Sequence, residues 1–297
     1  MEPSQFEKIF SRADSITGPF ADSLLQQAKF PPSTNSALVV LDMACGSGVV
    51  SSHIMALLSS EAKSRLDLTC ADTSDAMISN LTRRIEALGW KNTRAVIADA
   101  MVRQYQPDSL HLTLTMDVQD TKFPSSHFSH IFFNFGPMIL PNGLVGLREC
   151  HRILQPNGVL GFTTWQTVPW FIDYRAGIAM NPSLPSFPSD DRLKHAFSEA
   201  PERWDSVEDL RSHFEATGFD EVEVRVAECT TKYKLGEMED MMPYTLGMMI
   251  QKFWTKEELE KYQGPAGEAI LEYLKLKYSS GPIVWNWVGF VATGRKA

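Results

Sequence analysis

Short apolar runs alternate with amphipathic stretches along most of this 297-residue chain, and this alternation constrains the fold more than any other feature. The first run, Leu38–Leu41, is apolar at every position, which is typical of a strand buried on both faces of a parallel sheet. A helical pattern follows in Val49–Leu58, and a second strand pattern in Leu66–Ala71. The alternation predicts an α/β fold built on a doubly wound, mostly parallel sheet.

The same patterns continue toward the carboxyl end of the chain. Further strands are predicted at Leu112–Met116, Ile131–Phe135, Val159–Thr163, Val222–Val226 and Ile283–Thr293. Further helices are predicted at Phe6–Lys29, Ile78–Leu88, Leu144–Leu154, Val207–Phe214, Met238–Trp254 and Glu257–Tyr278. The last two strands enclose a helical insert, so we expect a seven-stranded sheet that ends in an antiparallel pair.

Two long segments interrupt the alternation, Gln166–Arg203 and about Thr230–Gly281. The first is rich in Pro, Trp and Phe and is too long for a plain connection, so we expect both to cap a pocket. The chain is therefore predicted to have a helical arm in residues 1–36 and a cofactor-binding core in residues 37–165. Residues 166–297 would supply the cap elements and the carboxyl-terminal half of the sheet.

Charge and cysteine content exclude several functions. There are 28 basic and 36 acidic side chains, and the net charge of −8 argues against nucleic acid as a partner. No apolar stretch approaches the ~20 residues that span a bilayer, and no secretory signal pattern opens the chain. The four cysteines, Cys45, Cys70, Cys150 and Cys229, lack metal-site spacing and suit a reducing compartment. We expect a soluble, cytoplasmic protein, and its oligomeric state stays open.

An acidic residue and a glycine-containing turn follow the first predicted strand. Gly46 and Gly48 allow the backbone to adopt positive φ and to approach a ligand closely. The second predicted strand leads into Asp72, 24 residues after Gly48. An acid at that place accepts hydrogen bonds from the ribose hydroxyls of an adenosine in dinucleotide-binding folds. These residues predict a nucleoside-binding site.

The charge of Asp42 indicates which nucleoside binds. In dinucleotide sites a pyrophosphate lies at the helix amino terminus, directly over this turn. A carboxylate just ahead of the turn would repel that group, and Ser51 occupies the place of the third glycine of the dinucleotide motif. S-adenosylmethionine has no phosphate and carries a sulfonium and an ammonium group. Asp42 therefore favours S-adenosylmethionine.

Four motifs resemble those of class I S-adenosylmethionine-dependent methyltransferases. They are Asp42–Gly48, the ribose-binding Asp72–Met77, the acidic adenine loop Met116–Phe128 of the UbiE-like subgroup, and Leu147–Gly158 before the fifth strand. Together they cover about residues 38–165. The general pattern, including the closing residues 291–296, resembles fungal secondary-metabolite methyltransferases of the gliotoxin thiol-methylating type.

The resemblance implies a set of cofactor-binding residues: Asp42, Ala44, Gly46, Gly48, Asp72, Thr73, Met77, Asp117, Val118 and Asn134, with Arg12 and Thr17 from the amino-terminal arm. Ala44 replaces the first glycine of the family motif. Asp117 and Val118 would meet the adenine edge, and Asp99 is the alternative to Asp117. Arg12 would pair with the methionine carboxylate, with Thr17 assisting.

Aromatic residues of the predicted caps are candidates for a substrate pocket: Trp165, Trp170, Phe171, Tyr244, Trp254 and Trp285. We expect a small-molecule acceptor, bound between the carboxyl ends of the strands and the caps, that receives the methyl group on S, O or N. The sequence marks no general base clearly, and His151, Asp173 and Glu239 are the candidates. Metal spacing is lacking at His127 with His130 and at Cys150 with His151, so no metal is expected.

Two alternatives remain at this stage. One is an NAD(P)-dependent oxidoreductase, which Asp42 disfavours because of its charge. The other is a relative that binds the cofactor without transferring a methyl group.

Overall fold

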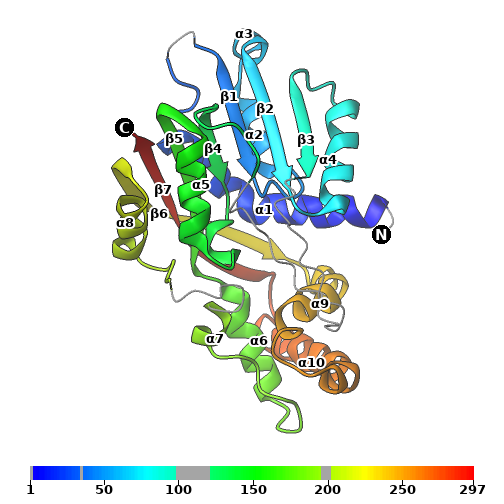
Figure 1. Ribbon diagram of the computed structural model, residues 1–297. Coiled ribbons are helices and arrows are strands. Elements are labelled where there is room, and N and C mark those ends of the chain that lie inside the picture. Colours follow the sequence, from blue (N-terminus) through cyan, green and yellow to red (C-terminus); the bar gives the residue numbers. More distant parts are fainter. Residues whose placement is uncertain (1–2, 34–35, 98–120, 195–201) are drawn as a thin grey trace, which may run out of the picture. The chain divides into compact units, whose positions relative to one another are not determined.

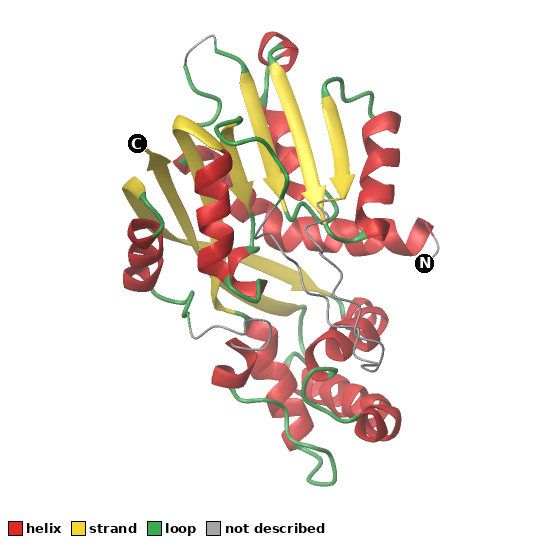
Figure 2. Ribbon diagram, viewed as in Figure 1, coloured by secondary structure: helices red, strands yellow, loops and turns green. Residues whose placement is uncertain are grey.

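The computed structural model describes residues 3–33, 36–97, 121–194 and 202–297. A seven-stranded sheet with the order β3-β2-β1-β4-β5-β7-β6 carries helices on both faces (Figure 1, Figure 2). The strands are β1 (Leu38–Met43), β2 (Leu66–Asp72), β3 (Thr93–Ile97), β4 (Phe128–Phe133), β5 (Leu154–Thr167), β6 (Phe219–Tyr233) and β7 (Ile283–Lys296). Strands β1 to β5 pair in parallel, and the two carboxyl-terminal strands are antiparallel. The predicted fold class is confirmed.

The helices of the described residues fall mostly where the sequence predicts them. They are α1 (Pro3–Gln27), α2 (Val49–Leu57), α3 (Ser60–Ser64), α4 (Asp75–Ala87), η1 (Pro137–Ile139), α5 (Gly143–Ile153), α6 (Pro169–Ala179), α7 (Asp190–Lys194), α8 (Val207–Ala216), α9 (Leu235–Ile250) and α10 (Lys256–Lys277). Local signals fix the ends of α4. Ser74 caps its first turn by accepting a hydrogen bond from the Met77 amide, and Gly89 follows its last turn at φ +61°.

The third strand along the chain differs from the expectation. The structure has β3 at Thr93–Ile97, paired with β2, where the sequence shows no clear pattern. This edge strand is short and its side chains are at most half-buried, so the alternation of apolar residues is weak. The predicted strand Leu112–Met116 lies outside the described residues.

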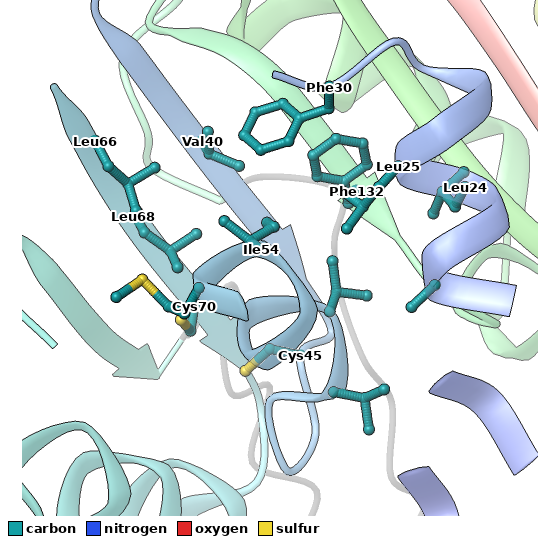
Figure 3. Packing of buried hydrophobic residues seen from close by; sticks show 14 of the residues in the cluster. Leu24, Leu25, Phe30, Val40, Cys45, Ile54, Leu66, Leu68, Cys70 and Phe132 are labelled. Atoms are coloured by element: carbon teal, nitrogen blue, oxygen red, sulfur yellow. The ribbon is translucent and has the colours of Figure 1, made fainter. Parts of the chain in front are cut away.

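Alternate residues of β1 point to opposite faces of the sheet. Leu38 and Val40 pack with α1, α2 and α4 in one core cluster, part of which Figure 3 shows. Leu41 and Met43 belong to a second cluster that includes residues of α5 and α8. Asp42 shares the parity of Val40 and therefore faces α2.

The strand order reverses between β1 and β4, where Asp42 lies opposite Phe132 in the register. In open parallel sheets, ligands bind at this point, outside the carboxyl ends of the strands. A ligand site is therefore expected at the carboxyl ends of β1, β2 and β4.

The chain divides into two compact units. Unit 1 comprises Met1–Gln166, Phe197–Ala227 and Gly289–Ala297, and unit 2 comprises Thr167–Ala196 and Glu228–Val288. Both β6 and β7 contribute residues to each unit. The proposed three-part division of the sequence stays a prediction.

Unit 2 joins the two segments that interrupt the alternation in the sequence. Helix α6 packs against α10 so closely that a Cβ on Gly177 would lie 2.6 Å from Ile270 Cα. The Tyr174 hydroxyl, on α6, lies 2.6 Å from the Thr245 hydroxyl on α9. Segments about 70 residues apart in sequence thus form one core. None of the helices in the described part of the chain carries an apolar stretch sufficient for a membrane crossing.

Candidate cofactor site

The turn between β1 and α2 adopts left-handed backbone conformations. The φ angles are +50° at Ala44, +50° at Gly46 and +82° at Gly48. The Cys45 amide donates to the Ala71 carbonyl (2.9 Å), which fixes the turn against the end of β2. A Cβ on Gly46 would meet no atom within 4 Å, so the turn leaves open space on that side. This is the geometry of a turn that a ligand approaches closely.

Asp72 connects the end of β2 to that turn. Its Oδ2 accepts a hydrogen bond from the Gly46 amide (2.8 Å), and its Oδ1 accepts one from the Ser74 amide (2.9 Å). A carboxylate has about four acceptor positions, so two remain for other donors. The half-buried Asp72 carboxylate can therefore hold two hydroxyl groups beside the glycine turn.

Asp42 is a buried carboxylate, with 1% of its surface exposed. Its Oδ2 accepts from the Ser51 amide (3.0 Å) and from the Ser51 hydroxyl (2.6 Å), both at the start of α2. Burial raises the pKa of Asp42 to about 7, against the lowering effect of the Ser51 hydrogen bonds and with a smaller raising effect of Asp72. Within the described residues, no basic side chain forms an ion pair with Asp42. Above about pH 7 the site therefore holds a buried negative charge that no basic side chain of the described residues balances.

The ends of β4 and β5 are joined by Thr163. Its hydroxyl donates to Asn134 Oδ1 (2.6 Å) and accepts from the Phe135 amide (2.9 Å). Asn134 Nδ2 in turn contacts the Thr17 carbonyl of α1 at 3.5 Å. The α1 helix therefore reaches the carboxyl end of the sheet beside the reversal of strand order.

Three aromatic rings lie beside these residues. Phe135, held at φ +55°, stacks on Trp165 with 3.7 Å between ring centroids. Phe20 of α1 meets both rings edge-on at 5.2 Å. A left-handed conformation is costly for a bulky residue and is tolerated where the surroundings enforce it, often at functional sites.

The structure brings several of the sequence-predicted residues together at one end of the sheet. These are Asp42, Ala44, Gly46, Gly48, Asp72, Thr73, Asn134 and Thr17, with Met77 on the first turn of α4. Arg12 is half-buried on α1. Asp117, Val118 and Asp99 lie outside the described residues.

His151 lies away from this place. It belongs to the last turn of α5, just before β5 begins, which puts it at the amino end of the parallel strands. Its carbonyl accepts from Lys296 Nζ (2.6 Å), and its ring meets Phe219 at 5.0 Å. Burial and the Lys296 charge lower the pKa of His151. His151 therefore lies at the amino end of the parallel strands, whereas Asp42 lies near their carboxyl end.

The other two base candidates belong to unit 2. Asp173 is 1% exposed and has three donors: Lys277 Nζ at 2.6 Å, Tyr278 Oη at 3.1 Å and Trp285 Nε1 at 2.7 Å. Its charge is neutralised by the chain itself. Glu239 is exposed on α9, 3.7 Å from Lys275 Nζ.

The predicted pocket aromatics divide between the units. Trp165 belongs to unit 1, and the other five belong to unit 2: Trp170, Phe171, Tyr244, Trp254 and Trp285. Trp285 and Trp254 are buried, while Tyr244 is 49% exposed. The Trp170 ring meets the Trp287 ring at 5.3 Å, and its buried Nε1 has no hydrogen-bond partner in the part of the chain that the structure describes. Their role in acceptor binding stays a prediction.

Sequence reasoning missed four residues of the site: Phe20, Ser51, Phe135 and Thr163. The sequence motif marks Ser51 only as a mismatch to a dinucleotide site, whereas in the first turn of α2 its amide and hydroxyl both donate to Asp42. The described residues contain no group of three or more His, Cys, Asp or Glu side chains placed to hold a metal ion.

Known methyltransferases match almost the whole length of this chain. A family model described as a methyltransferase domain matches residues 41–162. Methyltransferase tpcH of Aspergillus fumigatus is 30% identical over 292 residues, covering 98% of this chain and 96% of that protein. The acetylaranotin bis-thiomethyltransferase of Aspergillus terreus is 31% identical over 293 residues, covering 98% and 94%. The fold is shared with the YcgJ protein of Bacillus subtilis (TM-score 0.52, 12% identity, 93% and 97% covered).

The chain therefore belongs to the methyltransferase family and is an S-adenosylmethionine-dependent enzyme. The recognition made from the four motifs is confirmed, although the UbiE-like subgroup is not specifically supported. Nothing supports the oxidoreductase alternative.

Proposed function

We propose that this chain binds S-adenosylmethionine over the turn between β1 and α2 and methylates a thiol of a small secondary metabolite. Asp42, Gly46 and Asp72 would hold the cofactor, with Asn134 and Met77 beside it. The observation that carries this assignment is the buried carboxylate of Asp42, which lacks a counter-charge in the described chain.

The residues fit the cofactor chemically. A buried carboxylate is costly unless a positive group compensates it, and S-adenosylmethionine carries a sulfonium and an ammonium group. Gly46 leaves room for a ligand at the turn, and Asp72 has acceptor positions for the two ribose hydroxyls. Each feature matches a different part of the same molecule.

When bound, the cofactor supplies an electrophilic methyl group on a positively charged sulfur. The chain has to hold it, orient the acceptor and exclude water, and such positioning supplies up to ~7–11 kcal/mol of the barrier reduction. Phe135 and Trp165, stacked at the ends of β4 and β5, provide an apolar surface beside the proposed cofactor residues.

A thiol acceptor agrees with the residues near the turn. His151 lies at the other end of the parallel strands. Asp173 and Glu239 each form an ion pair with a lysine in unit 2. An alcohol needs a strong, positioned base, whereas a thiol with an ordinary pKa of about 8.5 is partly ionised near neutral pH. The Aspergillus terreus relative is a bis-thiomethyltransferase, which supports the same acceptor class.

Methyl-labelled S-adenosylmethionine and three matched acceptors test the proposal. The acceptors share one scaffold and carry a thiol, a phenol or an alcohol. We expect label in the thiol product and equimolar S-adenosylhomocysteine, with much slower transfer to the phenol and none to the alcohol. Preferred transfer to the alcohol would overturn the acceptor class, and failure to bind the cofactor would overturn the site.

The adenine contact requires a separate comparison. Asp117→Ala and Asp99→Ala remove the two candidate carboxylates one at a time. We expect the variant that lacks the adenine contact to bind S-adenosylmethionine about tenfold more weakly, since a hydrogen bond to a charged group contributes about 1.5 kcal/mol or more. Asp120→Ala serves as the control in the same stretch of sequence.

A further inference from the structure

His53 of α2 lies between two carboxylates of α1. Its Nδ1 is 2.6 Å from Asp22 Oδ1, and its Nε2 is 3.4 Å from Asp14 Oδ1. The imidazole is mostly buried, with 22% of the side chain exposed. Helix α2 begins directly after the glycine turn, and His53 stands about one turn into it. A single side chain therefore links α1 to the helix that starts at the proposed cofactor site.

The sequence of α1 is shaped for this contact. Asp14, Gly18 and Asp22 are spaced by four residues and share one face of the helix. A Cβ on Gly18 would lie 2.9 Å from His53 Nε2, so any larger residue at this position would make the imidazole shift. The two acids and the glycine together form the surface of α1 that His53 contacts.

The same part of α1 reaches the proposed site in two further places. The Thr17 carbonyl contacts Asn134, and Phe20 packs on Phe135 and Trp165. Gly289 of β7 makes room for Phe20, since a Cβ there would lie 2.9 Å from its ring. The position of α1 thus determines how Thr17 and Phe20 contact Asn134, Phe135 and Trp165.

Asp14 is also linked to the glycine turn through a second basic group. Burial lowers the pKa of the Arg84 guanidinium on α4, and the charge of Asp14 partly opposes that lowering. Arg84 in turn donates to the Ser47 carbonyl in the turn (3.4 Å). Histidine and arginine on two helices therefore face one acid of α1.

We infer that His53 is a positioning residue that holds α1 across the end of the sheet and thereby sets the affinity for S-adenosylmethionine. The inference rests on the proposed cofactor site. The two contacts join α1 to α2, so their loss would loosen the part of α1 beside α2, while the buried Leu24 and Leu25 still hold the helix and Asp42 and Asp72 keep their own hydrogen bonds. The expected effect therefore falls on cofactor binding more than on the rate of transfer from the bound state.

Calorimetric titration with S-adenosylmethionine measures the effect. We expect His53→Ala and His53→Gln to bind about three- to tenfold more weakly, the range that the loss of one or two partly exposed polar contacts supplies. His53→Lys, whose ammonium group can donate hydrogen bonds to both acids, should recover most of the affinity. The matched control, His127→Gln, changes a half-buried histidine at the start of β4 and should bind like the wild type.

Gly18→Ala gives a second, independent arm. Alanine favours helix more than glycine does, so α1 itself should become more stable, yet the added methyl group displaces the imidazole. We expect cofactor affinity to fall several-fold in the wild-type background and to stay unchanged when Gly18→Ala is added to His53→Ala. Equal losses in both backgrounds would contradict the inference.

Amide exchange in the cofactor-free protein supplies a readout that does not depend on activity. His53→Ala should speed exchange in the inner part of α1, about residues 13–24, and leave α5 unchanged. In steady-state kinetics the Michaelis constant for S-adenosylmethionine should rise while kcat falls by less than about twofold.

Asp72→Ala separates this inference from the proposed function. If Asp72→Ala abolishes cofactor binding and the His53 variants bind like the wild type, the role of His53 is wrong and the cofactor site stands. If Asp72→Ala leaves the affinity unchanged, the cofactor site itself is wrong, and the inference fails with it.

Discussion

Two buried carboxylates, one in each compact unit, are treated in opposite ways by the chain. Asp173 in unit 2 accepts from Lys277, Tyr278 and Trp285, so its charge is balanced within the fold. Among the described residues, Asp42 in unit 1 accepts only from the amide and hydroxyl of Ser51. Both are 1% exposed, so burial does not distinguish them.

The difference separates a structural charge from a functional one. A paired, hydrogen-bonded carboxylate such as Asp173 joins α6, α10 and β7 of unit 2. An uncompensated one is costly in the empty protein and becomes favourable only when a cation arrives. The cost of the buried Asp42 charge in the cofactor-free protein thus contributes to the preference for a positively charged ligand.

The largest expected effect on the free energy of unfolding comes from removing the Asp42 charge. Asp42→Asn keeps an oxygen that accepts from Ser51 and removes the charge. We expect the free energy of unfolding of the cofactor-free protein at pH 8 to rise by about 2 kcal/mol, the charge penalty less the cost of burying an amide NH₂. Urea unfolding measures it. A loss of stability at pH 8 would show that Asp42 is already compensated.

The matching change in unit 2 should have the opposite sign. Asp173→Asn leaves Lys277 without its carboxylate partner. Because the Lys277 side chain is partly exposed, water can hydrate its ammonium group and reduce the loss of stability. We expect the free energy of unfolding to fall by about 2 kcal/mol, less than a fully buried pair would lose. Far-ultraviolet circular dichroism during urea unfolding reports the change. A stabilised variant would mean that Asp173, like Asp42, carries an unbalanced charge.

The pH dependence follows from the raised pKa of Asp42. Its folded-state pKa of about 7 exceeds the ordinary 3.8, so its contribution to stability is full below about pH 4 and is lost as pH rises to 7. Affinity for S-adenosylmethionine should change the other way and rise about five- to tenfold from pH 6 to pH 7.5, as Asp42 ionises. Calorimetry at several pH values measures this, and Asp42→Asn should remove most of the slope.

Ala44 and Gly46 provide the smallest and most closely matched test. Both have φ +50°, a conformation that costs alanine about 1 kcal/mol and glycine little. Ala44→Gly should therefore raise the free energy of unfolding by up to about 1 kcal/mol and keep cofactor affinity. Gly46→Ala should lower both, since its methyl group enters the open side of the turn. Thermal melts with and without S-adenosylmethionine compare the two; equal behaviour would argue that no ligand lies over Gly46.

Much of unit 1 could be predicted because its signals are local. The continuous apolar run of β1, the caps of α4 and the turn glycines each act within a few residues. The strand β3 was missed because an exposed edge strand has little apolar alternation. Its residues give a pattern that fits a loop equally well.

The contacts that complete the site depend on tertiary packing. Ser51 reaches Asp42 only because α2 turns back over β1, and Phe20 reaches Trp165 only because α1 crosses the end of the sheet. The pairing of Asp173 with Lys277 spans 104 residues, so the sequence alone left Asp173 as a candidate base. No local sequence motif indicates such long-range contacts, so the sequence alone does not predict them.

The account rests on Asp42 selecting a cationic adenosyl ligand, and one titration series tests this directly. Wild type and Asp42→Asn are each titrated calorimetrically at pH 7.5 with S-adenosylmethionine and with NADH. We predict that the wild type binds S-adenosylmethionine and not NADH, and that Asp42→Asn binds S-adenosylmethionine at least about tenfold more weakly, the ~1.4 kcal/mol of one charge interaction. Unchanged affinity in the variant, or binding of NADH by the wild type, would contradict the account.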